Sequence, residues 1–327
     1  MKRSTFVLAA VFVLSAGRTD AVAWGCDGHR AVVFIAERLL APATIAAVKA
    51  TLVASPVDSA LKHFCDPVPD DLLADVASWA DDYRDVEPST FGWHFVNVPR
   101  AVVLTAANEA KYCPGGNCVI DAIATQFRAL TTASDAATKA NALRFIIHFV
   151  GDMHQPLHAT SNGDRGGNCV PVTYYDRVPQ ANPNGNGDYS PNLHGVWDSS
   201  TIRTLMTAKG LSDARALAGY VIAQHALPPA VAAQTPTKTV VTMWARSSHE
   251  LGRTVAYPRL PVKVELEPAS VVTPSSCTDN NDIVQRMLAK HEVIDATYEQ
   301  ASVPVILSQL RMAGIRLAAV LKAAYKP

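Results

Sequence analysis

The sequence has no excess of charge of either sign. Its 29 lysine and arginine residues balance 29 aspartate and glutamate residues. Such a chain has no overall basic field that would attract a nucleic acid. If it binds a polyanion, the positive charge must therefore be local, and a bound metal ion would supply it. Internal repeats and low-complexity tracts are missing from the sequence as well.

After its first apolar run, the sequence is expected to contain no second stretch that is long and apolar enough for a membrane helix. Its first one, Phe6–Leu14, follows the charged Lys2 and Arg3 and precedes the small residues Ala21–Ala23, which is the pattern of a cleavable export signal. This run is too short to span a bilayer. We therefore predict that residues 1–23 are removed and that residues 24–327 form a single domain. We expect a secreted or periplasmic monomer with no membrane insertion.

No Cys-x-x-Cys motif occurs, which argues against a zinc site built from thiolates and against a redox-active pair. Six cysteines in an exported chain are an even number in an oxidising compartment, so they predict disulfides. Cys113 and Cys118 bracket a Pro-Gly-Gly-Asn turn and are predicted to pair with each other. The other four allow three pairings that the sequence does not rank: Cys26, Cys65, Cys169 and Cys277.

Helical periodicity is the main structural signal that the sequence does contain. Hydrophobic residues make up 49% and charged residues 18%, which is typical of a globular protein. Apolar spacing predicts helices over residues 27–40, 43–53, 70–84, 119–131, 136–153, 193–206, 212–226, 237–250 and 282–325. We expect Ser190-Pro191 to open the helix over 193–206 and a break near Val303-Pro304. Residues 92–99 alternate weakly and are predicted to be extended, and the loop 161–190 contains a β-like run at 170–175. The predicted fold class is all-α, with a short β-hairpin-like loop.

The stretch from His148 to His158 carries the densest set of metal-binding side chains. It follows an apolar run, residues 142–147, that is typical of a helix buried on all sides. His148 and Asp152 are four residues apart and therefore project from one face of that helix. Pro156 ends the helix and directs His158 away from it. A buried imidazole and carboxylate are costly unless compensated, and both bind divalent metals. The alternative is a hydrogen-bonded His–Asp pair without metal.

Further groupings favour the metal interpretation. His194 and Asp198 repeat the four-residue spacing, and Asp81 ends a predicted helix shortly before His94. His29 lies five residues after Trp24, the predicted new N-terminus. A free terminal amine and its own carbonyl oxygen can chelate one metal ion together, so cleavage of the signal would complete that site. Imidazole and carboxylate without thiolate suit zinc in a hydrolytic role. The alternative is a set of unrelated core histidines.

The other histidines are not assigned to a site. His154 points away from the face that carries His148 and is interpreted as a core or supporting residue. Four more match no ligand position and are interpreted as non-functional: His63, His225, His249 and His291.

Six motifs occur in a fixed order along the chain. They are Trp24-Gly-Cys-Asp-Gly-His29, Ser78-Trp-Ala-Asp81, Trp93-His94-Phe95, His148-Phe-Val-Gly-Asp152-Met-His-Gln-Pro-Leu-His158, Gly166-Gly-Asn168 and Asn192-Leu-His194-Gly-Val-Trp-Asp198. This set resembles the exported single-strand-specific zinc nucleases of fungi, plants and bacteria, the nuclease S-one / P-one type, which are also 3′-nucleotidases. The resemblance is dense from Trp24 to about Met206 and thins beyond it, where the Pro-rich segment 228–276 resembles an insertion.

The resemblance implies a mainly α-helical fold that holds three zinc ions. One Zn2+ would be held by Asp81, His94, His148 and Asp152. A second would be held by the amine and carbonyl of Trp24 with His29, and would share Asp152. The third would be held by His158, His194 and Asp198.

The resemblance also implies roles for residues around these ions. Arg84 would face the phosphate and act in catalysis with Asp81 and Asp152; the alternative is a surface arginine paired with a neighbouring aspartate. Phe95 would stack a base, although it is as readily a core residue. Asn97 would hydrogen-bond the base, and it stands where fungal members carry Asp, which leaves base preference open. Asn168 would lie near the phosphate, or would merely complete a turn.

The function implied is hydrolysis of phosphodiester bonds in single-stranded DNA and RNA to 5′-phosphate products, together with 3′-nucleotidase activity. Zinc ions at a two-metal site activate water and stabilise attack on phosphorus, and a cation near the leaving 3′-oxygen neutralises its charge. A duplex cannot offer an unstacked base to a pocket at Phe95, which favours single strands. Two other functions remain open: a zinc phospholipase C, which carries Glu where this chain has Asp198, and an exported metal-binding protein without catalytic activity.

Overall fold

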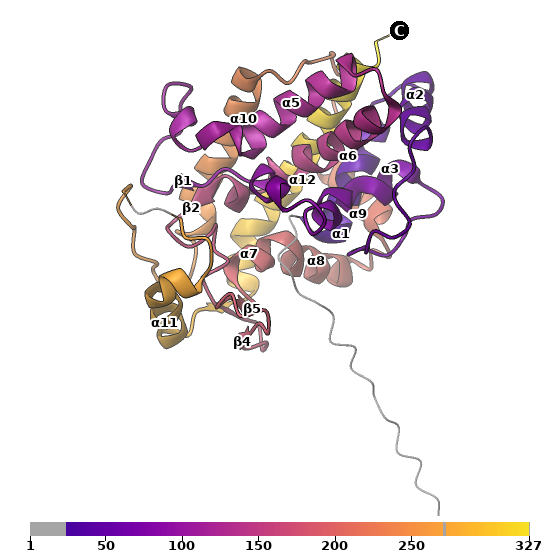
Figure 1. The fold of residues 1–327 in the computed structure, drawn as a ribbon. Coiled ribbons are helices and arrows are strands. Elements are labelled where there is room, and N and C mark those ends of the chain that lie inside the picture. Colours follow the sequence, from indigo (N-terminus) through magenta and orange to yellow (C-terminus); the bar gives the residue numbers. More distant parts are fainter. Residues whose placement is uncertain (1–23, 271–272, 327) are drawn as a thin grey trace, which may run out of the picture.

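The computed structural model describes residues 24–270 and 273–326, and helices dominate these residues (Figure 1). The predicted signal, residues 1–23, lies outside the described residues. Six of the predicted helices form with boundaries within about three residues of those expected. They are α1 (Gly25–Glu37), α2 (Pro42–Val53), α5 (Val119–Thr132), α6 (Ala136–Asp152), α9 (Ala214–Gln224) and α10 (Lys238–Leu251).

Side-chain caps fix where several of these helices begin. The Asp135 carboxylate accepts a hydrogen bond from the Thr138 amide at the start of α6, and Asp213 accepts one from Ala216 at the start of α9. Each cap satisfies a backbone donor that the first turn leaves free, which is typically worth about 1 kcal/mol. The helix α6 therefore begins at a defined residue, which sets the register of His148 and Asp152 near its other end.

The helix α6 forms the centre of the molecule. It is buried on all sides from Ala142 to Asp152, as its apolar run predicts. It packs against α5 and α1, and α1 in turn packs against α9 and the last helix, α12 (Ala296–Ala324). The close contact of α1 with α12 requires glycine at position 314, because a Cβ there would lie 2.4 Å from the Ile35 side chain. The fold class is therefore mainly helical, as predicted.

Two predicted elements near residue 80 differ from expectation. The segment 70–84 is divided into α3 (Leu72–Asp75), a 3-10 turn and α4 (Trp79–Tyr83). Most of the segment 92–99 is not extended, because a 3-10 helix, Pro88–His94, precedes the two-residue strand β1 (Val98–Pro99). The reason is tertiary packing: Trp79 and Trp93 both place their rings edge-on against Phe145 of α6, and this outweighs the weak alternation of the local sequence.

The predicted helix over 193–206 begins at a different cap. It consists of α7 (Leu193–Gly195), a π-helical turn (Val196–Ser200) and α8 (Thr201–Lys209). Its cap is Asn192, whose side chain accepts a hydrogen bond from the Gly195 amide at 2.8 Å, so the prediction that Ser190-Pro191 opens the helix is wrong. Pro191 is held outside the helix because its carbonyl accepts a hydrogen bond from the Val172 amide.

The C-terminal segment breaks at a different place from the one predicted. The helix α11 (Asn281–Lys290) and the strand β6 (Val293–Ile294) precede α12, and Pro304 lies inside α12 without ending it. As a result, α12 is long and apolar enough, by length and composition alone, to cross a membrane, contrary to the expectation that no such stretch exists. In its most apolar part, 56% of the residues are buried inside the protein, which accounts for that composition.

Three short two-stranded sheets connect the loops. β1 pairs in parallel with β2 (Thr160–Ser161), and β3 (Thr173–Tyr174) pairs in parallel with β6. The predicted hairpin-like loop contains the antiparallel pair β4 (Gln180–Ala181) and β5 (Tyr189–Ser190). Because Val98 aligns with Thr160, the segment that follows His94 runs beside the segment that follows His158.

All six cysteines form disulfides. The predicted Cys113–Cys118 bond is present, and the other pairs are Cys26–Cys65 and Cys169–Cys277. The last of these ties the loop after His158 to the segment before α11. Three disulfides fit an exported protein.

Candidate metal centre

The helices α4 and α6 bring the first predicted ligand set together. His148 and Asp152, one turn apart on α6, have Nε2 and Oδ2 3.3 Å from each other. Asp81 on α4 places its Oδ2 3.6 Å from the same nitrogen of His148. His94, at the end of its 3-10 helix, lies with Nδ1 3.0 Å from Asp152 Oδ2. All four side chains are buried, so the sequence prediction grouped residues that the fold does bring together.

His29 on α1 joins this group from the other side. Its Nε2 lies 3.3 Å from Asp152 Oδ1, and its ring stacks on that of His148 with 4.0 Å between the ring centroids. Glycine is required at position 151, since a Cβ there would lie 2.7 Å from His29 Nδ1. The Trp24 indole donates a hydrogen bond to the Gly151 carbonyl at 2.8 Å, and the Trp24 backbone amide donates one to Asp198. The main chain at Trp24 is therefore fixed beside His29, Asp152 and Asp198.

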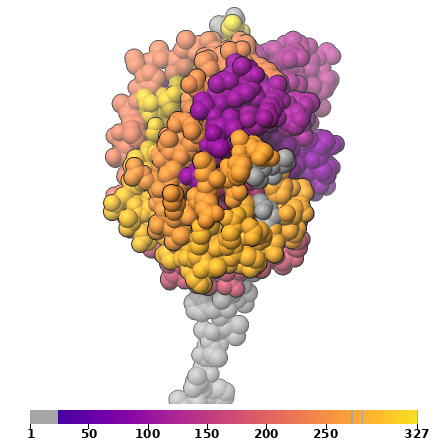
Figure 2. Space-filling view, turned by 90° about the vertical axis from the view of Figure 1, so that its left-hand side faces the viewer, coloured from indigo at the N-terminus to yellow at the C-terminus, as the bar shows by residue number. Residues whose placement is uncertain are grey.

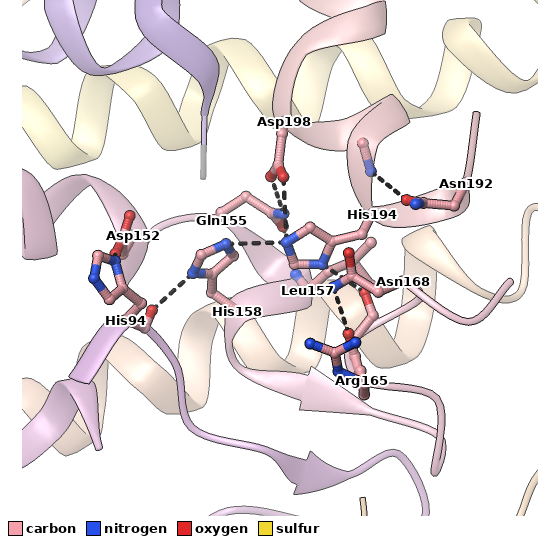
Figure 3. Close-up of polar contacts among 12 residues, drawn as sticks. His94, Asp152, Gln155, Leu157, His158, Arg165, Asn168, Asn192, His194 and Asp198 are labelled. Atoms are coloured by element: carbon pink, nitrogen blue, oxygen red, sulfur yellow. Dashed lines mark hydrogen bonds and ion pairs between the residues drawn. The ribbon is translucent and has the colours of Figure 1, made fainter. Parts of the chain in front are cut away.

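A third group lies at the start of the predicted 193–206 helix (Figure 3). His158 and His194 have their Nε2 atoms 3.1 Å apart, and His194 Nε2 lies 3.2 Å from Asp198 Oδ2. The other ring nitrogen of each histidine bonds to a backbone carbonyl, His158 to His94 and His194 to Gly166, both at 2.7 Å. These contacts orient both imidazoles with Nε2 toward the centre.

The donor atoms of these groups fit divalent metal ions. Three sets have their potential ligand atoms within 4.8 Å of one another: His29/Asp81/His148, His94/His148/Asp152 and His158/His194/Asp198. Several of these atoms are buried without a hydrogen-bond partner among the described residues, including both ring nitrogens of His29, Asp152 Oδ1 and Asp198 Oδ2. Buried polar atoms without partners are costly, and several of them converging on one point are characteristic of a cation site.

The protonation of the cluster supports the same conclusion. Burial lowers the pKa of His29 to about 4 and that of His194 to about 3. Burial also lowers the pKa of His148, but the carboxylates of Asp152 and Asp81 outweigh it and raise this pKa to about 9. Without a cation, the buried carboxylates therefore retain a proton on His148 as their positive partner. A divalent ion supplies that charge instead, and its binding would release the proton.

A cleft of about 770 Å³ opens over the His94, His158 and His194 side of the cluster. Figure 2 shows a face of the molecule on which purple and orange surfaces, from segments far apart in the sequence, lie side by side. The cleft wall includes four residues predicted to act on substrate: Arg84, Phe95, Asn97 and Asn168. A second hollow of about 670 Å³ continues beyond Phe95 and shares Phe91 with the cleft.

The structure agrees in part with the non-functional interpretations that the sequence left open for the cleft residues. Arg84 does pair with Asp81, with Nη1 and Oδ1 3.3 Å apart, and it also lines the cleft. Phe95 is only partly buried, and its ring meets the exposed Phe91 edge-on at 5.5 Å. Asn168 does complete a turn, because its Nδ2 donates to the Arg165 carbonyl at 2.7 Å, while it also faces the cleft. His154 is buried outside the cluster and bonds to Arg316, as expected for a core residue.

Sequence reasoning missed three residues at this centre. Gln155 donates its amide to Asp198 Oδ1 at 2.6 Å and thereby orients that carboxylate. Phe91 and Arg165 line the cleft. Gln155 lies inside the quoted motif His148–His158, and Arg165 directly precedes the quoted motif Gly166–Asn168, but a single glutamine or arginine gives no periodic signal that would mark it.

Three buried histidine–aspartate groups lie beneath an open cleft, which is an arrangement consistent with metal sites. Residues 24–326 match the S1/P1 Nuclease family, and the chain belongs to this family. The chain is 29% identical to "Nuclease S1" of Aspergillus oryzae over 205 residues, which cover 60% of either chain. It is 27% identical to "Endonuclease 2" of Arabidopsis thaliana over 309 residues, covering 91% of this chain and 89% of the relative. For "Nuclease P1" of Penicillium citrinum the identity is 29% over 203 residues, covering 61% of this chain and 66% of the relative. The chain thus spans less than two thirds of the two fungal relatives.

Proposed function

We propose that this protein is an exported zinc-dependent endonuclease that hydrolyses phosphodiester bonds in single-stranded DNA and RNA to 5′-phosphate products and also acts on 3′-nucleotides. The observation that carries the proposal is the placement of three histidine–aspartate groups at the floor of a cleft whose wall holds Arg84 and Phe95. Membership of the S1/P1 nuclease family supports the same reaction class.

The proposed ligand sets follow the three groups. Asp81, His94, His148 and Asp152 would hold one zinc ion. The amine and carbonyl of Trp24 with His29, sharing Asp152, would hold the second. His158, His194 and Asp198 would hold the third. When bound, zinc supplies an activated water for attack on phosphorus and a positive charge at the leaving oxygen.

The residues of the chain position the substrate around that reaction. Arg84 donates to the non-bridging phosphate oxygens, and its pairing with Asp81 holds the guanidinium over the cleft. Phe95 offers a ring face to an unstacked base, and Asn97 offers an amide to the edge of that base. No described residue group forms a sequence-reading helix in this cleft, so selectivity comes from stacking and strand flexibility. A paired duplex cannot supply such a base without melting.

We also propose that the mature chain is one monomeric domain that begins at Trp24. Removal of residues 1–23 would convert the Trp24 amide, which now bonds to Asp198, into a free amine beside His29 and Asp152. N-terminal sequencing of the exported protein together with zinc analysis tests this directly. We expect tryptophan as the first residue and three zinc ions per chain. A leader retained on fully active protein would refute it.

The activity is tested by assaying heat-denatured DNA, RNA, 3′-AMP and phosphatidylcholine in parallel, before and after chelation. We expect hydrolysis of the first three, loss of activity with chelator and recovery with zinc. Hydrolysis of phosphatidylcholine alone would instead identify a phospholipase C, and tight zinc binding without turnover of any substrate would identify a non-catalytic protein.

Variants of Arg84 separate catalysis from metal binding. We expect Arg84→Ala to lower kcat about 100- to 1,000-fold at unchanged zinc content, as the loss of one preorganised donor does elsewhere. Arg84→Lys is the matched control that keeps the charge, and it should recover only part of the activity because lysine cannot donate two parallel hydrogen bonds. An Arg84→Ala protein with full activity would contradict the proposal.

A further inference from the structure

A second arginine faces the same cleft without a partner. Arg165 lies in the cleft wall and is partly buried. Among the described residues, no hydrogen bond or ion pair engages its guanidinium, although its backbone carbonyl is bonded by Asn168. Arg84, in contrast, already pairs with Asp81. The carboxylates of Asp188 and Asp279 act on the Arg165 charge from nearby, but neither forms an ion pair with the guanidinium. A half-buried guanidinium whose donors have no direct protein acceptor is suited to bind an anion in the cleft.

The backbone holds Arg165 in a conformation that arginine rarely adopts. Its φ is 55°, and the next two residues, Gly166 and Gly167, have φ of 62° and 86°. A non-glycine residue in this left-handed region costs about 1–3 kcal/mol and is found mostly where a function requires it. No hydrogen bond of the Arg165 side chain offsets that cost, so the strained conformation is held by contacts of the neighbouring residues and of the backbone.

Several bonds fix this strained turn in place. The fully buried carboxylate of Asp164 accepts hydrogen bonds from the Gly167 amide at 3.0 Å and from the Tyr257 hydroxyl at 2.8 Å. The Gly166 carbonyl bonds to His194 Nδ1 at 2.7 Å. The turn is thus anchored to both the core and the third histidine–aspartate group, and the Arg165 side chain extends from a rigid base.

Arg165 lies at one end of the row of three histidine–aspartate groups. Arg165 directly precedes Gly166, whose carbonyl oxygen lies 2.7 Å from His194 Nδ1, so Arg165 lies beside the third group. Figure 3 shows the Arg165 side chain on the same side of His194 as Asn168, with Asp198 on the other side. Arg84 lies at the other end, beside Asp81 and His94. The two arginines therefore flank the cluster, and they repel each other unless anions lie between them.

We propose that Arg165 binds the 5′-phosphate of the nucleotide whose 3′-oxygen is the leaving group. This rests on the proposed function, in which Arg84 binds the scissile phosphate, and it assigns the charge at the leaving 3′-oxygen to the ion that the third group would hold. In a single strand the next phosphate on the leaving-group side lies one nucleotide away, and Arg165 is the cation on that side of the cleft. A 3′-mononucleotide has no such phosphate, so Arg165 distinguishes polymers from mononucleotides.

Two small substrates isolate the contact: adenosine 3′-phosphate and adenosine 3′,5′-bisphosphate, which differ only in the 5′-phosphate. We expect kcat/KM of the wild-type protein to be about tenfold higher for the bisphosphate, since one hydrogen-bonded charge pair in a partly exposed site typically contributes that much. Arg165→Asn should bring the ratio close to one while leaving kcat/KM for the monophosphate within about twofold. The effect should fall mainly on KM.

Asparagine is chosen because it tolerates positive φ, so the turn keeps its conformation. Arg165→Gly is a second variant of this kind, and Arg165→Lys should restore part of the preference. Arg128→Asn on the exposed surface of α5 controls for the loss of one positive charge. For single-stranded DNA, the slope of log(kcat/KM) against log salt concentration should become shallower by about 0.7 in Arg165→Asn and stay unchanged in Arg128→Asn.

Three results would overturn the inference. The wild-type protein could show no preference for the bisphosphate, or the Arg165→Asn protein could keep that preference. In the third case, Arg165→Asn would lower kcat/KM equally for the monophosphate and the bisphosphate. The last would mean that Arg165 acts on the scissile phosphate or on the fold. A wild-type protein that hydrolyses neither adenosine phosphate would overturn the proposed function itself, and with it this assignment.

Discussion

Gly166 offers the sharpest single test of how the cleft loop is built. Its φ is 62°, and a Cβ at this position would lie 2.3 Å from the Leu157 carbonyl oxygen and 3.3 Å from His194 Nδ1. Gly210, which ends α8, has the same φ of 62°, yet a Cβ there would meet nothing within 4 Å. The two glycines thus share a backbone conformation and differ only in their surroundings.

Alanine at either position carries the strain of the left-handed region, about 1–2 kcal/mol. Gly166→Ala adds a collision with a backbone oxygen, which cannot rotate away, so either the loop or the residues at 157–158 must move. Forcing one extra carbon into a packed region typically costs a further 1–3 kcal/mol or so. We therefore expect Gly166→Ala to lose about 2–5 kcal/mol of unfolding free energy, and Gly210→Ala about 1–2 kcal/mol.

The displaced residues also lie next to proposed metal ligands. Leu157 precedes His158, and the Gly166 carbonyl orients His194. Urea unfolding at a fixed zinc concentration, together with zinc analysis of both variants, measures the two effects. We expect Gly166→Ala to lose zinc from the third group and Gly210→Ala to keep it. Equal stability loss and equal zinc content in the two variants would refute the close approach that the structure shows.

Three further predictions concern other parts of the chain. Burial raises the pKa of Glu292 from 4.5 to about 7, so the folded protein holds a proton that the unfolded chain releases. Glu292 should therefore lower the unfolding free energy as pH rises from 4.5 to 7, and Glu292→Gln should remove this contribution from the pH dependence measured by urea unfolding; identical pH profiles for the two proteins would contradict the assignment. Replacing both Cys169 and Cys277 by alanine removes a disulfide that closes a loop of 108 residues, and should lower the unfolding free energy measured in urea by about 4–5 kcal/mol. A decrease below about 1 kcal/mol would contradict the loop-entropy estimate. Gln155→Leu leaves Asp198 without its amide donor and should weaken zinc binding at the third group about 10- to 100-fold in a chelator competition, with unaltered binding as the refuting result.

The sequence predicted the parts of the structure that depend on periodicity. The helix α6 follows from an apolar run, and the pairing of His148 with Asp152 follows from their four-residue spacing, because one helical turn brings them to the same face. The Cys113–Cys118 bond follows from a short turn that holds the two residues close. In these cases the local chain geometry alone determines the contact.

The features that the sequence did not predict depend on distant partners. Pro304 is tolerated within α12, which a local propensity rule excludes. The roles of Gln155 and Arg165 depend on Asp198 and on the turn around Gly166, which the fold alone brings near. Which cysteines pair in the two long-range disulfides also depends on the folded path of the chain. Spacing within one helix carries no information about such contacts.

The contact between α1 and α12 has a consequence for how the protein is made. These two helices lie against each other although nearly the whole described sequence separates them (Figure 1). The segment that carries His29 therefore leaves the ribosome long before the helix that completes its packing is synthesised. Until that helix emerges, the nascent polypeptide cannot hold its first histidine rigidly beside the other ligands. We therefore expect the proposed metal centre to assemble late, and shortening the chain at its far end to displace His29 near its beginning.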